Sequence, residues 1–594
     1  MYNTDVPSGH LLVEPRALAA SFLSRKSFPN LSRSAYDKLR GRLVELATGV
    51  ASGNPEAISE VSELSNSLIT GYHDLELLHS LAIPQQSSEW DERHYLMLVS
   101  IRSCVRAFWK YRACGDRELD RSALLAAKER LANAGRQPKL ARGVGDLIRK
   151  HVLRALGPCP DLASLIPSHG PGATATGERG FAKWDFSRMY RQLLPFGGVD
   201  LFHVNENHWM RAPYALSLCT HGFTKIVCVP KDVRGPRVIS CEPLELMFLQ
   251  KALCTHLMPV INRNTRGYVK FQSQEDHQGF MLDGGLRFVT LDLKDASDLI
   301  SRRLVWQCTK GSEWQKLLFA VRSHFAAFDS EGDEVAPLRT FAPMGSAMCF
   351  VVLSLVIYGL VKASKPAHPF SIYGDDLIVH VEDFLKVRKA LTLAGLKLNL
   401  AKTCHVTRFR ETCGVDAVFM GPFGDKCHVW NTMPKLHFQC QPAYVKTLAY
   451  NREGIYSLIG NLETLYRTGD TEVMFNIVHS MIRYAEMRDT RLVRFLEPGI
   501  CEALLRYCRD YYKGDDRVRT YTRIEQLRSP RRFNKSLQRL EYRTFLAQPK
   551  GEEVGDGYPM LFASLTKRSD RELRFPNAES LKIRVGWCPV VTRG

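Results

Sequence analysis

The chain has 594 residues, of which 45% are hydrophobic and 24% are charged, and this ordinary balance argues against wholesale disorder. The length gives room for about four average domains or for one large enzyme with several lobes. The formal net charge of +19 favours a polyanionic partner, nucleic acid before a membrane surface.

The first 160 residues are predicted to be largely helical. Apolar residues recur at helical spacing in residues 34–50, 55–69, 90–112 and 117–134, with polar faces between them. Several arginines and lysines lie in these segments. Because solvated helix faces account for most of this charge, it is only a weak indication of RNA contact.

A loop rich in glycine and proline follows at residues 169–177. Its backbone amides could hold an anion, but it lacks the Lys-Ser/Thr ending of a P-loop, and a structural turn is the favoured interpretation. Aromatic and basic residues come next, from Phe181 to Arg191. They fit either base stacking with phosphate contacts or an ordinary packed loop.

Residues 225–240 predict a basic β-hairpin. Two β-type runs flank a turn region that carries Lys231, Arg234 and Arg237. Arginine binds phosphate oxygens through paired hydrogen bonds, and lysine acts as a compact point charge, so this hairpin could grip a triphosphate. The alternative is a solvated, charged hairpin without a ligand.

Residues 286–293 predict a buried strand, with Asp292 near its carboxyl end. A carboxylate in such a strand is costly to bury unless it is paired or bound to a metal. Asp298 follows where the chain should turn into a helix over residues 298–307. Its alternative role is therefore to cap that helix.

The stretch from Ser371 to His380 is a second predicted hairpin, with Gly374 and Asp375 at its turn. It would present Asp375 and Asp376 together at the tip, where two carboxylates should share a proton or hold a divalent cation. Mg²⁺ prefers oxygen ligands of this kind. An ordinary surface turn is the alternative.

Further predicted elements lie on either side of this hairpin. Before it, the small residues Gly345 and Ser346 lead into an apolar helix and let another backbone or a nucleotide approach closely. After it come a helix over residues 383–394, a strand over residues 397–400, and Lys402 just past that strand.

The last 160 residues are predicted to be mostly helical and are strongly basic. Arginines alternate with aromatic residues between Arg517 and Phe545, which fits RNA backbone binding with base stacking as well as solvated helix faces. Gly514-Asp515-Asp516 repeats the triplet of the second hairpin. No apolar runs flank it, so it is interpreted as a solvated turn.

The sixteen cysteines include no Cys-x-x-Cys pair, which disfavours zinc ribbons and thioredoxin-like redox sites. Since no signal peptide is recognisable at the start, a reducing, cytoplasmic setting is expected. The longest apolar run, residues 349–361, is shorter than the roughly 20 residues that span a bilayer. A buried core helix is expected there, and no membrane segment is predicted.

The order of these features indicates phosphoryl-transfer chemistry. A basic hairpin, a strand ending in Asp292, a Gly-Ser helix start and the Asp-Asp hairpin follow one another within residues 225–380. Two cations held by the carboxylates could clamp the attacking and leaving oxygens of an in-line displacement. Lys231 and Arg237 could neutralise the triphosphate that is broken.

At these residues the chain resembles the replicase subunit of single-stranded RNA bacteriophages (leviviruses) and, more broadly, viral RNA-directed RNA polymerases. The resemblance covers about residues 225–420, and the helical ends match only in length and general character. Segments similar to the family's motifs stand in the family's order: the fingers motif at residues 229–243, three palm motifs at 290–301, 341–355 and 372–377, the fourth motif at 399–403 and the segment after it at 409–414.

The resemblance implies an α+β right-hand polymerase fold, with fingers, palm and thumb around an antiparallel palm sheet. It implies replication of a positive-strand RNA phage genome by two-metal nucleotidyl transfer from NTPs, in the cytoplasm of an infected bacterium. The expected division is a helical N-terminal region bridging fingers and thumb (1–160), fingers with the basic NTP-binding hairpin (161–285), a palm with the catalytic carboxylates (286–430) and a basic helical thumb and C-terminal region (431–594).

The resemblance also implies the site residues. Asp292, Asp375 and Asp376 would be catalytic and would bind two Mg²⁺ or Mn²⁺ ions. Lys402 would be the catalytic proton donor to the leaving pyrophosphate. The expected substrate-binding residues are Lys231, Arg234, Arg237, Asp298, Gly345 and Ser346.

The expected partners are template and product RNA, NTPs and, by resemblance alone, host elongation factors Tu and Ts and a ribosomal RNA-binding protein. The family's second palm motif usually reads Met-Gly-Asn-Gly, whereas this chain has Ser346 and Ala347 at its last two positions. Cys349 and Leu353 stand where many viral RNA polymerases carry a Thr and an Asn that help to read the ribose 2′-hydroxyl. Asp298 and Ser346 would therefore carry more of the sugar selectivity.

Other classes of function stay open at this point. A reverse transcriptase shares the carboxylates, but it usually carries a bulkier residue at the position of Gly374. A non-catalytic basic RNA-binding protein would have carboxylates that only cap turns. A metal-dependent nuclease is permitted by the carboxylates, but no nucleophile-positioning His or Glu beside these strands supports it.

Overall fold

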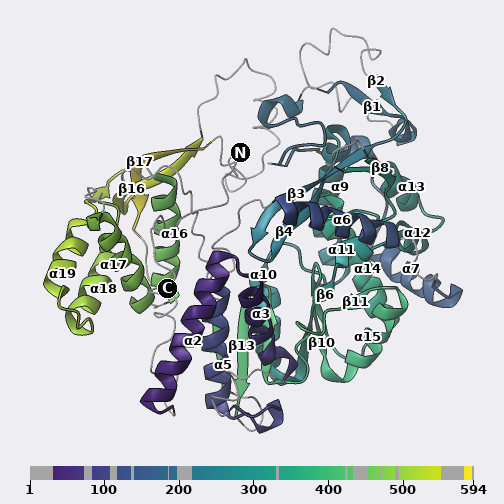
Figure 1. The fold of residues 1–594 in the computed structure, drawn as a ribbon. Coiled ribbons are helices and arrows are strands. Elements are labelled where there is room, and N and C mark those ends of the chain that lie inside the picture. Colours follow the sequence, from purple (N-terminus) through teal and green to yellow (C-terminus); the bar gives the residue numbers. More distant parts are fainter. Residues whose placement is uncertain are drawn as a thin grey trace.

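Helices and small sheets alternate along the chain, which gives a mixed α/β protein (Figure 1). This content agrees with the predicted α+β class. The computed structural model describes residues 31–71, 83–107, 117–134, 140–196 (except 171 and 185), 217–328, 334–421, 424, 426–431, 452–468, 471–487, 494–549 and 581–590.

The described helices of the N-terminal region lie close to the predicted segments, of which residues 108–112 fall outside the description. The Ser32 hydroxyl accepts a hydrogen bond from the amide of Ala35, and the Asn54 side chain accepts two at the next helix start. The first three of these helices pack on one another. They are α2 (Arg33–Ser52), α3 (Pro55–Thr70), α5 (Glu92–Ala107), α6 (Arg117–Asn133) and α7 (Arg142–Leu156).

A four-stranded sheet carries the predicted basic hairpin. Its strands β3 (Phe223–Asp232) and β4 (Gly235–Cys241) pair antiparallel, which confirms the hairpin. β7 (Phe325–Phe328) and β8 (Glu334–Pro337) complete the order β4-β3-β7-β8. Helix α6 packs across β3 and β4, so the N-terminal region reaches this sheet (Figure 1).

The predicted Asp-Asp hairpin lies in a three-stranded antiparallel sheet. β9 (Ser371–Tyr373) and β10 (Asp376–His380) are the two strands of the hairpin. β5 (Phe288–Leu291) pairs with β10 on its other side, which gives the order β5-β10-β9. The hairpin prediction is therefore confirmed.

The strand expected over residues 286–293 is interrupted at Asp292. The chain leaves β5 there and enters β6 (Leu293–Lys294), which pairs with β11 (Lys397–Leu398) in a separate two-stranded sheet. β11 is thus two residues shorter than the strand expected over 397–400. Asp292 therefore lies at the junction of two sheets and not inside one continuous strand.

The helix expected over residues 298–307 is divided into α11 (Ala296–Leu299) and α12 (Arg302–Thr309). The Ser301 hydroxyl caps α12 by accepting a hydrogen bond from the Leu304 amide. Asp298 lies inside α11, so the capping role considered for it is wrong.

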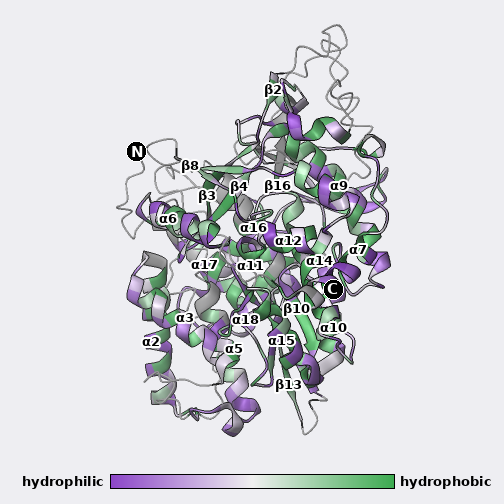
Figure 2. Ribbon diagram, turned by 90° about the vertical axis from the view of Figure 1, so that its right-hand side faces the viewer, coloured by the Kyte–Doolittle hydropathy of each residue, from purple (hydrophilic) through white to green (hydrophobic). Residues whose placement is uncertain are grey.

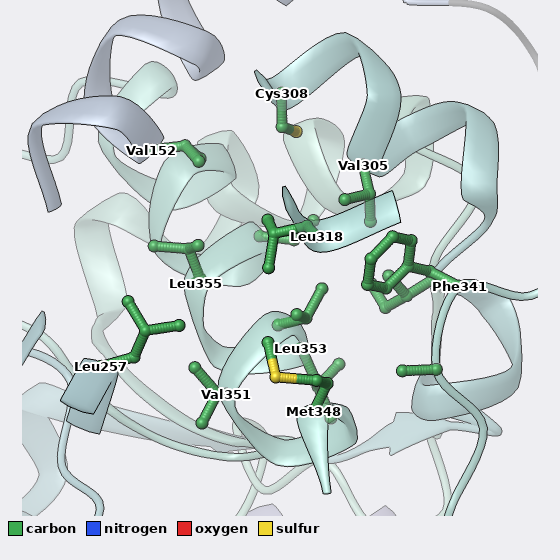
Figure 3. Packing of buried hydrophobic residues seen from close by; sticks show 14 of the residues in the cluster. Val152, Leu257, Val305, Cys308, Leu318, Phe341, Met348, Val351, Leu353 and Leu355 are labelled. Atoms are coloured by element: carbon green, nitrogen blue, oxygen red, sulfur yellow. The ribbon is translucent and has the colours of Figure 1, made fainter. Parts of the chain in front are cut away.

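Helix α14 (Met348–Ala363) forms the middle of the largest core cluster, as the apolar run predicted. Figure 3 shows Met348, Leu353 and Leu355 of α14 among side chains from α7, α9 and α12. Both α14 and β10 are drawn as mainly hydrophobic ribbon in Figure 2. Among the described helices, α9 (Leu244–Asn264) has the length and composition of a membrane span, but 61% of its apolar window is buried in the protein, as in a core helix.

The C-terminal region is only partly helical, so the prediction of mostly helical structure is wrong for its last part. Three antiparallel strands follow the helices, in the order β15-β16-β17. Polar and apolar residues alternate from Arg539 to Arg543, and this period of two favours a strand. The elements are α16 (Arg452–Thr468), α17 (Thr471–Met487), α18 (Pro498–Asp510), α19 (Arg517–Gln526), β15 (Arg531–Asn534), β16 (Arg539–Pro549) and β17 (Leu581–Pro589).

Smaller elements fill the space around the sheets. The segment after the Asp-Asp hairpin forms a helix, as predicted for residues 383–394, and then a second antiparallel sheet in the order β12-β13-β14. The elements are β1 (Arg188–Tyr190), β2 (Ser217–Cys219), α10 (Gln274–Gly284), α13 (Glu313–Ala320), α15 (Phe384–Leu393), β12 (Phe409–Thr412), β13 (Val415–Met420) and β14 (Lys426–Asn431).

Candidate active site

The three predicted carboxylates meet at one end of the β5-β10-β9 sheet. Leu377 of β10 pairs with Leu291 of β5, and one further step of this antiparallel register sets Asp376 opposite Asp292. Asp375 is exposed at the turn, next to Gly374 with φ +66°. A Cβ at position 374 would lie 2.4 Å from the Phe350 ring, so the turn requires glycine.

Burial and mutual repulsion control the charges of this group. Burial raises the pKa of Asp376 to about 7, and the negative charges of Asp375 and Glu411 act in the same direction. Burial also raises the pKa of Asp292, while the Lys402 ammonium opposes that shift. Acidic oxygens held together under such repulsion are the donor set that a hard divalent cation neutralises.

The loop that carries Lys402 is attached directly to Asp292. The Asn399 side-chain amide donates a 2.8 Å hydrogen bond to Oδ2 of Asp292, and the Asn399 backbone amide donates to the Asp292 carbonyl at 2.9 Å. Lys402 Nζ lies 3.6 Å from Asp292 Oδ1. The structure therefore places Lys402 beside Asp292.

The basic hairpin lies within electrostatic reach of the same loop. Desolvation by the surrounding protein lowers the pKa of Lys231 and the Asp232 charge opposes this shift, while the nearby cations Arg237, Arg234 and Lys402 lower the pKa further. Lys231 and Arg237 are both exposed. Arg234 instead forms a fork with Asp232, with Nε 3.0 Å from Oδ1 and Nη2 2.7 Å from Oδ2. Its guanidinium thus closes the hairpin turn.

The Gly345-Ser346 loop packs directly on β4 of the basic hairpin. The Ser240 amide donates to the Met344 carbonyl at 2.7 Å, and a Cβ on Gly345, whose φ is +107°, would lie 2.3 Å from the Ser240 carbonyl oxygen. Only glycine permits this approach. The buried Ser346 hydroxyl donates to Gln250 Oε1 at 2.9 Å, so Ser346 fastens the loop to helix α9.

Leu353 and Cys349, both on helix α14, have different surroundings. Leu353 is 5% exposed and packs in the core around α14 (Figure 3). Cys349, one helical turn earlier, has a thiol whose pKa is raised by burial and by the charges of Asp298 and Asp375. The Cys349 thiol therefore lies within electrostatic reach of the Asp298 and Asp375 carboxylates.

Three further residues act on the site through a charge, a hydrogen bond or an ion pair, although the sequence did not indicate them. Glu411 of β12 adds a carboxylate charge to Asp292 and Asp376. The Cys413 thiol donates to Asp376 Oδ2 at 3.2 Å, and Arg130 binds Asp298. Glu411 and Cys413 lie in the segment compared with the family, but nothing in the local sequence marks Arg130.

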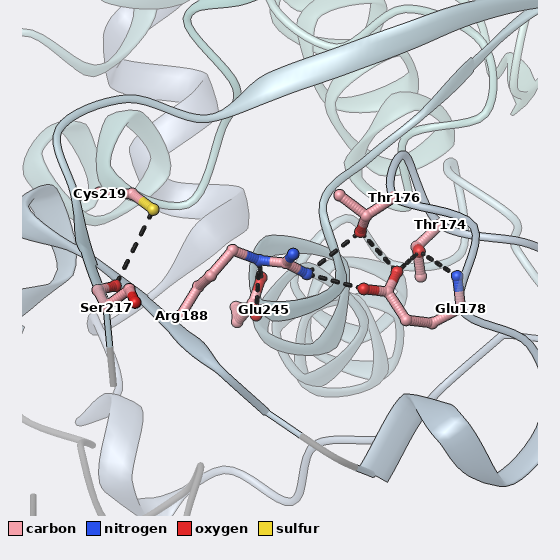
Figure 4. Close-up of polar contacts among 7 residues, drawn as sticks. All are labelled: Thr174, Thr176, Glu178, Arg188, Ser217, Cys219 and Glu245. Carbon is pink, nitrogen blue, oxygen red and sulfur yellow. Dashed lines mark hydrogen bonds and ion pairs between the residues drawn. The ribbon is translucent and has the colours of Figure 1, made fainter. Parts of the chain in front are cut away.

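The glycine-rich loop before the first sheet is a structural turn, as favoured. Glu178 accepts hydrogen bonds from Thr174 and from Arg188 Nη2, the latter at 2.8 Å, and Arg188 Nε lies 3.2 Å from Glu245 Oε1 (Figure 4). Lys183 donates to two carbonyls of the loop. These cations stabilise the loop, so they do not form an anion site.

The second Gly-Asp-Asp triplet is a turn before α19, as expected, but Asp516 is not simply solvated. It accepts hydrogen bonds from the Tyr512 hydroxyl at 2.6 Å and from His479 Nε2 at 3.1 Å. Asp515 is exposed. The triplet has no strand pairing that would hold both carboxylates in one direction.

Another group of possible metal ligands, His368, His380 and Glu382, lies at the other end of β10. The two imidazole rings are stacked with centroids 3.7 Å apart and planes 17° from parallel. Because an imidazole lone pair lies in the ring plane, one ion cannot lie in both planes. This arrangement therefore does not fit a shared metal ion.

The part of the chain that holds the candidate site is similar to known proteins. The family model described as RNA replicase, beta-chain matches residues 216–422, which contain every predicted site residue. The RNA-directed RNA polymerase beta chain of Escherichia phage MS2 is 33% identical over 196 residues, which are 32% of this chain and 34% of that protein. That of Enterobacteria phage fr is 30% identical over 220 residues, 36% of this chain and 38% of that protein.

Among solved structures, the RNA-dependent RNA polymerase from bacteriophage phi12 is similar with a TM-score of 0.40 and 12% identity, over 66% of this chain and 70% of that one. The matched part of this chain spans about a third of the length of the phage MS2 and fr relatives. The segment that holds the candidate active site thus matches the RNA replicase beta-chain family, and the curated relatives that align with it are RNA-directed RNA polymerases of bacteriophages.

Proposed function

We propose that this protein is an RNA-directed RNA polymerase that copies an RNA template from NTPs. The observation that carries the proposal is the meeting of Asp292, Asp375 and Asp376 at one sheet end, opposite a basic hairpin, inside the segment that matches the replicase family. We assign the β5-β10-β9 sheet to the palm of a right-hand polymerase, the β3-β4 hairpin to the fingers and the C-terminal region to the thumb.

The donor set fits two Mg²⁺ or Mn²⁺ ions, because it offers acidic oxygens whose repulsion a cation relieves. Asp292, Asp375 and Asp376 would hold the ions, and Glu411 is close enough to add its charge. Ions held there would supply the Lewis-acid chemistry for activating an attacking hydroxyl and stabilising a leaving oxygen. This use of the acidic group explains why the fold keeps the carboxylates side by side, two of them partly buried.

The cations around the carboxylates have separate roles in this proposal. Lys231 and Arg237 bind the triphosphate from the exposed face of the hairpin. Lys402, held beside Asp292, donates a proton to the pyrophosphate as it leaves. Arg234 stabilises the hairpin through Asp232, and as an exposed cation it stays a proposed substrate-binding residue.

The biological setting follows from the same assignment. We propose replication of a positive-strand RNA phage genome in the cytoplasm of an infected bacterium. Host elongation factors Tu and Ts and a ribosomal RNA-binding protein are proposed partners, since the resemblance to phage replicases is what suggests them.

Mg²⁺ affinity should depend on pH through Asp376. The pKa of this carboxyl is raised from the ordinary 3.8 to about 7, and the ion binds the ionised form. Below pH 7 binding must displace a proton, so the apparent Kd should weaken about tenfold per pH unit. Titration calorimetry of the full-length protein between about pH 5.5 and 8 would show this slope, with a plateau above 7. A flat profile across that range contradicts the assignment of Asp376 as a ligand.

The proposed function is tested by template-dependent synthesis. Purified full-length protein, a phage-like RNA template, NTPs and Mg²⁺ should yield complementary RNA, assayed with and without bacterial extract because host proteins are proposed partners. Parallel reactions with dNTPs separate an RNA polymerase from a reverse transcriptase. RNA binding without any synthesis, even with extract, would support the non-catalytic alternative, and template degradation would support a nuclease.

A further inference from the structure

Helix α6 of the N-terminal region reaches the candidate active site from outside the segment that matches the family. It packs across β3 and β4 of the basic hairpin and against α11, the short helix that begins just after Asp292 (Figure 1). Helix α6 therefore contacts both the basic hairpin, which is proposed to bind the triphosphate, and helix α11, which carries Asp298.

Arg130 near the end of α6 makes the contact. Its Nε donates a 3.2 Å hydrogen bond to Oδ2 of Asp298 and lies 3.7 Å from Oδ1 of Asp295. The Asp298 side chain is 18% exposed and that of Arg130 is 33% exposed. The Thr340 hydroxyl donates to the Asp298 backbone carbonyl at 2.8 Å. The backbone of Asp298 is thus fixed by the palm, and its carboxylate is oriented by the N-terminal helix.

The Asp298 carboxylate faces the same space as the proposed metal ligands. Helix α11, which carries Asp298, packs against α14, and the charges of Asp298 and Asp375 both raise the pKa of the Cys349 thiol on α14. A thiol is a weak hydrogen-bonding group, and Leu353 is turned into the core. Asp298 is therefore the strong acceptor here, and a carboxylate has lone pairs for more than one donor.

We propose that Arg130 is a positioning residue that orients Asp298 to accept the 2′-hydroxyl of the incoming ribonucleotide, so that the N-terminal helix sets the sugar selectivity. The inference rests on the proposed polymerase function. An arginine suits this role because its planar fork fixes the orientation of a carboxylate, whereas a lysine supplies charge without that geometry.

The test compares three substrates in the full-length polymerase: CTP, 2′-deoxy-CTP and 2′-fluoro-CTP. The last substrate keeps an electronegative group but cannot donate a hydrogen bond. Arg130→Met should lower kcat/KM for CTP about tenfold, mainly through KM, and leave the values for the other two nearly unchanged. Arg130→Lys should fall between the wild type and Arg130→Met. The matched control is Arg121→Met, which removes an exposed cation from the same helix and should leave the selectivity intact.

A merely structural role gives a different result. It would lower kcat/KM equally for all three substrates and keep their ratio, and this outcome overturns the proposal. Asp298→Asn should already have lost the selectivity, so adding Arg130→Met should not lower it again; independent, additive losses also overturn the proposal. If Arg130→Met melts early, the comparison of Arg130→Lys with Asp298→Asn decides. A wild type that makes no RNA with any template or extract contradicts the polymerase assignment, which is a separate failure.

Discussion

Asp375→Asn is expected to reduce template-directed RNA synthesis by at least about 10³-fold while the protein stays folded. Asparagine keeps the size of the side chain but removes the charge that would bind a cation. Asp375 is exposed at a turn whose shape depends on Gly374, so the substitution leaves no cavity. Loss of its negative charge should also bring the pKa of Asp376 down from about 7, because repulsion from Asp375 helps to raise it.

The matched control is Asp515→Asn in the second Gly-Asp-Asp triplet. Asp515 is exposed in a turn as well, but it is not held on paired strands near other carboxylates. Its substitution should leave synthesis within about twofold of the wild type, as is usual for surface changes away from special features. Primer extension on an RNA template, with thermal melting of each variant, measures both effects. Wild-type synthesis by Asp375→Asn would refute the mechanism.

Arg102→Met is expected to lower the free energy of unfolding by about 3–5 kcal/mol. Arg102 on α5 donates from Nε to Asp416 Oδ2 at 3.0 Å and from Nη1 to the Ser65 carbonyl at 2.6 Å. Both members of the ion pair are about 4% exposed or less. Methionine fills much of the volume but leaves the buried Asp416 charge without this cation, and that loss dominates the effect.

Two further variants separate the charge effect from packing. Arg42→Met removes an exposed partner of Glu60 and should change stability by less than about 1 kcal/mol. The double variant Arg102→Met, Asp416→Asn should recover part of the loss, because no charge is then buried alone. Urea unfolding followed by tryptophan fluorescence measures all three. A cost for Arg102→Met no larger than that for Arg42→Met would show that the buried pair adds little stability.

The sequence predicted the parts of the site that depend on neighbouring residues. Each hairpin is a local structure: its apolar runs and its turn residues lie within about a dozen positions, so pattern and turn chemistry suffice. The register that sets Asp376 opposite Asp292 joins two strands far apart in the sequence, and the alternation within each strand does not determine it. Placement of Lys402 beside Asp292 needed the additional β6-β11 pairing, which no local pattern indicates.

Contacts between distant segments could not be predicted in this way. Arg130 and Asp298 are 168 residues apart, and nothing near either residue marks the other. Leu353 stands where many viral RNA polymerases carry an Asn that helps to read the ribose 2′-hydroxyl. In this structure its side chain packs in the core, and Cys349, one turn earlier, lies nearer the carboxylates. The high density of arginine in the C-terminal region does not distinguish helix from strand, and the alternation that favours a strand is confined to residues 539–543.

The core cluster that joins the N-terminal helices to the C-terminal region affects when the protein can fold during its synthesis. This cluster joins α2, α3 and α5 to β12 and β13 and then to α16, α17 and α18. A ribosome makes these parts in sequence, so the first helices emerge long before their packing partners exist. Their apolar faces stay exposed, or shielded by chaperones, until helices α16 to α18 have been translated. The assembled molecule is therefore available only after synthesis is nearly complete, and slow, non-local folding is expected to govern how quickly newly made chains become active.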